Sequence, residues 1–178
     1  MRAGAAGVVP SGRWNPVRLK PTRYVGCRVF VNGEVVGSMS AAAYLSYKKQ
    51  LIPTILESYY ALAQTHDIVV LEGAGSPAEI NLKAEDIVNM GMARMAGAPV
   101  LLAGDIDRGG VFAALYGTLA LLEPDERALG KGTTIHTLRG DAENHRPGLT
   151  QPEEPTHVTG AGVGPWTGSH TDAGESHT

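Results

Sequence analysis

The chain has 178 residues, of which 43% are hydrophobic and 6% aromatic, so its length and composition suit one domain of ordinary size with an aliphatic core. Its formal charge of −3 and the lack of a basic stripe argue against a nucleic-acid partner, and the single cysteine, Cys27, excludes an internal disulfide. Since no apolar run approaches the roughly 20 residues of a membrane span and residues 1–14 lack the apolar centre of a signal peptide, we expect a cytoplasmic protein without a membrane partner.

The N-terminal residues predict a loose leader followed by a short strand and a hairpin. Residues 1–14 are rich in glycine and alanine and show no hydrophobic period. Residues 17–20 are predicted to form a strand that Pro21 stops. The pair Asn32-Gly33 between apolar flanks is typical of a two-residue hairpin turn, because both residues tolerate positive φ. We expect this hairpin to be an antiparallel addition to a larger sheet.

Three helical stretches follow along the chain. Ser40 offers an N-cap to a long stretch with apolar residues at three- and four-residue spacings, which Pro53 must kink or split. Residues 86–96 are predicted to form a methionine-rich helix, and residues 111–122 a further helix that Pro124 ends.

Continuous apolar runs predict the strands of a parallel sheet. Residues 68–71 and 99–103 are short apolar runs without alternation, which suits strands covered on both faces, and residues 131–136 form a further strand. The alternation of strands with helices specifies a mostly parallel sheet with right-handed crossovers. We expect all of these strands, together with residues 17–20, to lie in one sheet of an α/β fold.

The C-terminal part has a different character. From residue 142 onwards proline, glycine, threonine, histidine and acids dominate, and such a segment cannot bury enough apolar surface to offset its ordering entropy. We therefore expect residues 142–178 to be a disordered tail. Its histidines share no ligand spacing with cysteines or carboxylates, so no metal cluster is expected there.

Two acid-bearing, glycine-rich loops follow two of the predicted strands. Glu72 is placed as the acid of a Walker-B-like strand, able to hold Mg²⁺ that bridges nucleotide phosphates, and Gly73 and Gly75 let the backbone approach a ligand. Asp105 follows the second strand, and ligands of open α/β sheets bind at such strand ends. The alternatives are a solvated strand-end carboxylate for Glu72 and an internally salt-bridged loop around Asp105.

These loops also carry a resemblance to a known family. Between Asn15 and about Asp141 the chain resembles the synthetase domain of the adenosylcobyric acid synthases, which belong to the dethiobiotin-synthetase-like P-loop superfamily. The resemblance rests on seven blocks: NPV at 15–17, LKPT at 19–22, VNG at 31–33, VVG at 35–37, EGAGSPAEINL at 72–82, DIVNM at 86–90 and GDIDRGGVFA at 104–113. Residues 15–141 are therefore expected to be a partial synthetase domain between the leader and the tail.

The resemblance implies an amide-forming ligase of cobalamin biosynthesis. In the family, ATP activates peripheral carboxylates of adenosylcobyrinic acid a,c-diamide, and ammonia from a C-terminal glutaminase domain forms the amides. It implies Mg²⁺ and ATP as cofactors, a corrinoid substrate, and a glutaminase-bearing chain or a homo-oligomer as partner. The roles that it assigns are catalytic for Asp105, Asp107 and Arg108, nucleotide-binding for Lys20, Gly73, Gly75 and Ser76, and metal-binding for Glu72.

The sequence departs from the family pattern in several places. No Gly-x-x-x-x-Gly-Lys-Ser/Thr phosphate loop and no glutaminase domain are present, Tyr24 replaces an acid, and His136-Thr137 replace an Asn-Lys pair that reads adenine. We expect the chain to be inactive alone. The alternatives are a nucleotide-independent corrinoid-binding module completed by a partner, and a dethiobiotin-synthetase-like or partition-type ATPase.

Overall fold

The computed structural model describes residues 4, 6–22, 26–107, 109–138 and 160–165. The chain forms two compact units, one of residues 1–74 with 84–96 and the other of residues 75–83 with 97–178. Each unit has a three-stranded sheet of its own. None of the helices in the described residues combines the length and apolar character needed to cross a bilayer.

The sheet of the first unit is antiparallel. Strands β1 (Val17–Pro21), β2 (Cys27–Val31) and β3 (Glu34–Met39) pair in the order β1-β2-β3. Asn32 and Gly33 form the turn between β2 and β3 with φ angles of 50° and 93°, so the predicted hairpin is confirmed. A short 3₁₀ helix, Gly12–Trp14, precedes β1.

The helices of the first unit follow the predicted break. The long helical stretch divides into α2 (Ala41–Tyr47), a 3₁₀ turn (Lys48–Leu51) and α3 (Ile52–Ala63), with Pro53 in the first turn of α3. There the missing N–H of proline costs no helical hydrogen bond. Ser40 caps α2, because its hydroxyl accepts a backbone N–H of the first turn at 3.2 Å.

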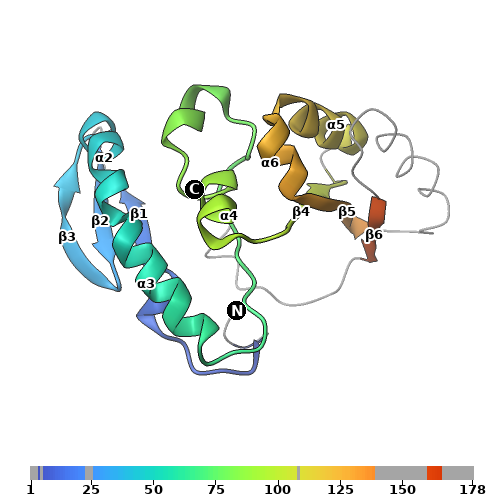
Figure 1. The fold of residues 1–178 in the computed structure, drawn as a ribbon. Coiled ribbons are helices and arrows are strands. Elements are labelled where there is room, and N and C mark those ends of the chain that lie inside the picture. The colour runs from blue at the N-terminus through green and yellow to red at the C-terminus, as the bar shows by residue number, and fades with distance from the viewer. Residues whose placement is uncertain (1–3, 5, 23–25, 108, 139–159, 166–178) are drawn as a thin grey trace. The chain divides into compact units, whose positions relative to one another are not determined.

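The core of the first unit lies between these helices and the sheet. Leu51 and Ile55 pack with Ile87 and Met92, and Val17 and Val31 of the sheet are among the partly buried residues around them. Figure 1 shows α3 running alongside the antiparallel sheet. The remaining helices of this part of the chain are a 3₁₀ helix, Ile80–Glu85, which crosses from one unit to the other, and α4, Met90–Ala96.

The second unit has the expected α/β architecture. Strands β4 (Val100–Asp105), β5 (Gly130–Leu138) and β6 (Gly160–Pro165) are parallel, in that order. Helices α5 (Val111–Leu121) and α6 (Pro124–Leu129) lie beside this sheet in Figure 1. The predicted fold class, a parallel sheet flanked by helices with a small antiparallel hairpin, is confirmed.

Helix α5 packs closely on β4. Val111, Leu115 and Ile135 form the core of the second unit. A Cβ added at Gly104 would lie 2.6 Å from Val111 Cγ2 and 3.1 Å from Leu115 Cγ. Glycine at this position therefore allows the close approach of helix and strand.

Several predicted elements differ from the structure. Residues 68–71 form no strand, and Ile68 and Val70 are 81% and 87% exposed. The expectation of one common sheet is therefore wrong, since β1 also pairs in the antiparallel sheet. An apolar run becomes a strand only where a neighbouring strand satisfies its backbone, and within the described residues this run has none.

Two further boundaries are corrected. The helix expected from residue 86 begins at Met90, and Pro124 starts the additional helix α6. Strand β6 lies within the segment expected to be disordered, where its backbone pairs with β5 although half of its residues are glycine. Apart from residues 160–165, the predicted tail is outside the described residues.

Candidate functional site

At the carboxyl edge of the parallel sheet, an acid and a histidine occupy paired positions on neighbouring strands. Asp105 ends β4 and is in register with His136 of β5, and the N–H of Ile106 donates to the His136 carbonyl at 3.5 Å. The Asp105 carboxylate also accepts the N–H of Asp107 at 3.0 Å. Asp105 and Asp107, predicted as site residues, therefore share one loop at the edge where ligands of parallel sheets bind. Arg108 lies outside the described residues.

Two glycines turn this loop into α5. Gly109 and Gly110 have φ angles of 72° and 67°, a region that side chains disfavour, and the N–H of Gly109 donates to the Ile106 carbonyl at 3.1 Å. Gly110 is the N-cap of α5 and brings no capping side chain. The N–H groups of the first turn of α5, at the positive end of its dipole, therefore start beside the acidic loop.

The Glu72 loop is held by a neighbouring asparagine in the first unit. Asn89 donates from Nδ2 to the Ala74 carbonyl at 3.0 Å. A Cβ added at Gly73 would overlap the Asn89 side chain. Gly73 is thus required for packing against Asn89, and the amide of Asn89 fixes the backbone that follows Glu72.

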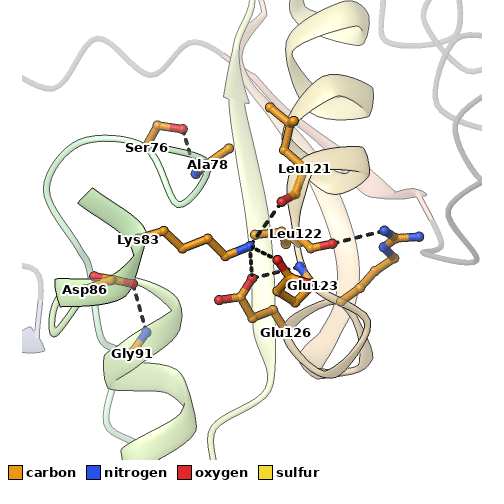
Figure 2. Close-up of polar contacts among 10 residues, drawn as sticks. Ser76, Ala78, Lys83, Asp86, Gly91, Leu121, Leu122, Glu123 and Glu126 are labelled. Atoms are coloured by element: carbon orange, nitrogen blue, oxygen red, sulfur yellow. Dashed lines mark hydrogen bonds and ion pairs between the residues drawn. The ribbon is translucent and has the colours of Figure 1, made fainter. Parts of the chain in front are cut away.

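Asp86 in turn fixes the segment that carries Asn89. Its carboxylate accepts the N–H groups of Val88, Asn89 and Gly91 at 2.8, 3.0 and 2.9 Å, the last of which is drawn in Figure 2. Burial raises the pKa of Asp86, but these three N–H groups and nearby Lys48 outweigh it and hold the pKa below its ordinary value. Asp86 and Asn89 are positioning residues that the sequence pattern had placed inside a helix. The available signal was Asp86 itself, because an aspartate side chain often accepts the backbone N–H groups two and three residues later, as in an Asx turn.

The Gly75-Ser76 loop of the second unit is held closed by hydrogen bonds within the loop, one of them to the carboxylate of Glu79. The N–H of Ser76 donates to Glu79 Oε1 at 3.4 Å. The Ser76 hydroxyl accepts the N–H of Ala78 at 3.2 Å, a bond that Figure 2 draws. In this arrangement the amide of Ser76, which the resemblance assigns to the nucleotide, already has a carboxylate as its acceptor. A phosphate at this loop would compete with Glu79.

Lys83 anchors that loop to the second unit. Its ammonium group donates to the Leu121 carbonyl at 3.2 Å and to Glu123 at 3.2 Å, and it lies 2.9 Å from Glu126. Figure 2 draws these contacts. The Glu126 side chain is only 4% exposed, and it also accepts the N–H of Glu123 at 2.9 Å, completing a capping box on α6. The hydrogen bond to Glu126 is the main cause that raises the pKa of Lys83.

The predicted site residues are divided between the two units. Lys20 is exposed on β1, opposite Arg28 of β2, in the unit that also contains Glu72 and Gly73. Gly75, Ser76, Asp105 and Asp107 belong to the other unit. Within the second unit the structure brings Asp105 and Asp107 together in one loop.

The donor set for a metal consists of single carboxylates on separate loops. Among the residues that the structure describes, no group of three or more His, Cys, Asp or Glu side chains is arranged to hold a metal ion. Mg²⁺ at phosphate-processing sites needs only one or two carboxylates besides phosphates and water. The single carboxylate of Glu72 fits such an ion by its chemistry, whereas the closed Ser76 loop does not fit a phosphate without rearrangement.

Three relatives found by comparison with known proteins carry the same name. A cobyric acid synthase of Lachnoclostridium phytofermentans is 65% identical over 150 residues, which are 84% of this chain and 29% of that protein. Those of Yersinia enterocolitica and Ruminiclostridium cellulolyticum are 56% and 52% identical over 165 and 166 residues, in each case 93% of this chain and 32% of the relative. The chain thus spans about a third of the length of these curated relatives. No family model and no solved structure matches it.

Proposed function

This chain belongs, over the part that it spans, to the cobyric acid synthase family, and from that premise we propose that it supplies loops of an ATP-dependent amide-forming site. The observation that carries the proposal is the carboxyl edge of the parallel sheet. There Asp105 and His136 lie in register beside the glycine-rich start of α5.

Within this proposal each described loop has a separate task. When bound, Mg-ATP would activate a carboxylate of a corrinoid so that ammonia can displace phosphate and form an amide. The N–H groups at the start of α5 would hold an anionic group of the substrate or nucleotide, and Asp105 and Asp107 would orient the groups that react there. Glu72 would hold the metal, while Asp86 and Asn89 keep its loop in place.

The 178 residues alone are proposed not to complete the reaction. They contain no Gly-x-x-x-x-Gly-Lys-Ser/Thr sequence, and the amide of Ser76 is bonded to Glu79. The amides and lysine of a phosphate loop normally provide much of the affinity for nucleotide phosphates. Two lost charge-assisted contacts at roughly 1.5–3 kcal/mol each would weaken nucleotide binding by about 10²–10⁴-fold.

A chimera tests the proposal. In the Lachnoclostridium cobyric acid synthase the matching 150 residues are replaced by those of this chain, and the product is assayed by mass with ammonium, Mg-ATP and the a,c-diamide. Ammonium as the nitrogen source makes the assay independent of any glutaminase. The chimera is expected to amidate the corrinoid and the isolated chain to give no product. A folded chimera without product contradicts the proposed role, and product from the isolated chain contradicts its inactivity alone.

A further inference from the structure

The face of the antiparallel sheet that bears Phe30 also carries a row of three cations. Arg18 and Lys20 are alternate residues of β1 and so share one face, and they pair with Phe30 and Arg28 of β2 respectively. Arg18, Lys20 and Arg28 are all exposed. We call these three residues the basic row.

The basic row works against the stability of its own sheet. Lys20 and Arg28 stand directly opposite each other on neighbouring strands, and like charges in this position destabilise a sheet. Arg28 has Ser38 as its partner on β3, and within the described part of the chain no ion pair involves any of the three cations. Such a local conflict is expected where a surface serves a ligand. The formal charge of the whole chain is −3, so this positive surface is a local feature.

A cavity lies at the Arg18 end of the row. It has a volume of about 180 Å³ and is lined by Ser11, Gly12, Asn15, Arg18, Phe30 and Gly33. The Arg18 guanidinium stacks 4.9 Å from the centroid of the Phe30 ring. Stacking holds the group in place through its face and leaves its in-plane N–H donors for a ligand. Ser11 and Asn15 add polar side chains to the wall.

We propose that the basic row and this cavity bind a small molecule that carries at least two carboxylate or phosphate groups. Alternate residues of a strand are about 6.6–6.8 Å apart, and directly paired residues about 4.5–5.5 Å. The row therefore offers cations at a spacing that suits two or three anionic groups on one molecule, and arginine binds such groups with paired N–H donors. Of the three residues in the basic row, the family resemblance assigns only Lys20 to a ligand, so Arg18, Arg28 and the cavity are new members of a site.

Calorimetric titration of the 178-residue chain at low salt tests the proposal. The probes are butane-1,2,3,4-tetracarboxylate and inorganic tripolyphosphate, and the preferred probe identifies the anionic group. Arg18→Gln and Arg28→Gln should each weaken binding roughly tenfold, the loss expected for one charge-assisted contact. Lys49→Gln is the matched control, because it removes one positive charge from an exposed side chain of the same unit. It should change the affinity less than about twofold, since screened surface charges contribute little at a distance.

Three results would overturn the proposal. These are failure of the wild-type chain to bind either probe at millimolar concentration, unchanged binding in both arginine variants, and an equal loss in Lys49→Gln. Circular dichroism shows whether each variant is folded. If Arg18→Gln is unfolded, the result for Arg28→Gln decides the test, because the Arg28 side chain is exposed and makes no hydrogen bond to the residues that the structure describes. Tighter binding of duplex DNA than of either probe, lost in the same variants, would also overturn the assignment to a small molecule.

Discussion

Replacing Lys83 by methionine should destabilise the second unit far more than the same change at Lys49. Both ammonium groups lie 2.9 Å from a glutamate oxygen. The Lys83 and Glu126 side chains are 21% and 4% exposed, whereas those of Lys49 and Glu85 are 57% and 36% exposed. The distance is equal, so the two pairs differ in their burial and in the two further acceptors of Lys83, the Leu121 carbonyl and Glu123.

The magnitudes follow from that burial. Removing one partner of a fully buried pair costs roughly 3–5 kcal/mol, because the remaining charge is left without compensation. Lys83 keeps some contact with water, so we expect Lys83→Met to lower the free energy of unfolding by about 2–3 kcal/mol. Lys49→Met should cost about 0–1 kcal/mol, the value for exposed pairs. Adding Glu126→Gln to Lys83→Met removes the unpaired charge and should recover part of the loss.

Urea denaturation followed by circular dichroism measures these differences. Since the pKa of Lys83 is raised in the folded chain, its contribution is fully present below the unfolded lysine pKa of about 10.4 and is lost as the pH rises through the folded value. The difference between wild type and Lys83→Met should therefore be constant from about pH 7 to 10. Equal costs for Lys83→Met and Lys49→Met would refute the reasoning from burial.

Three further predictions concern packing, capping and the basic row. Gly104→Ala should lower the free energy of unfolding by about 1–3 kcal/mol, because the added Cβ meets Val111. Gly117→Ala should raise it by about 0.5–1 kcal/mol, because the position lies in α5 and has open space around it. Equal effects in urea denaturation would contradict the packing of α5 on β4. Asp86→Ala should cost about 1–2 kcal/mol, and because the folded pKa of Asp86 is lowered, its contribution is present above about pH 4 and is lost as the pH falls further; an unchanged acid transition in the variant would contradict this. Lys20→Glu should stabilise the sheet by about 0.2–1 kcal/mol, because it replaces the repulsion from Arg28 with an opposite-charge cross-strand pair, and the melting temperature should rise slightly. A lower melting temperature would count against the repulsion.

The sequence correctly predicted those turns, caps and helix breaks that depend on the local preferences of one or two residues. The turn at Asn32-Gly33, the cap at Ser40 and the break at Pro53 each follow from the backbone preferences or the short side chain of the residue itself. Residues 68–71 have the composition of a strand, but composition cannot show whether a partner strand is present. Within the described residues this run has no partner strand, which is the physical reason why the one-sheet prediction is wrong.

Parts of the candidate site depend on contacts between distant segments. The register of β4 with β5 places Asp105 beside His136, and parallel pairing of two predicted strands was enough to expect an acid at that edge. The three bonds that Lys83 makes to residues 121–126, and the bond from Asn89 to Ala74, arise only from tertiary packing. The basic row is likewise invisible in the sequence, because Arg28 joins Arg18 and Lys20 only through strand pairing.

The most direct test of the proposed site is the turnover of the chimera with Asp105→Asn, compared with Asp125→Asn as a control on the acidic first turn of α6. If the carboxyl edge of the parallel sheet carries the chemistry, Asp105→Asn should lower kcat for amide formation by about 10²-fold or more and leave the melting temperature unchanged. Asp125→Asn should leave kcat within about twofold, because surface substitutions away from a site have small effects. Full turnover by the Asp105→Asn chimera would contradict the account.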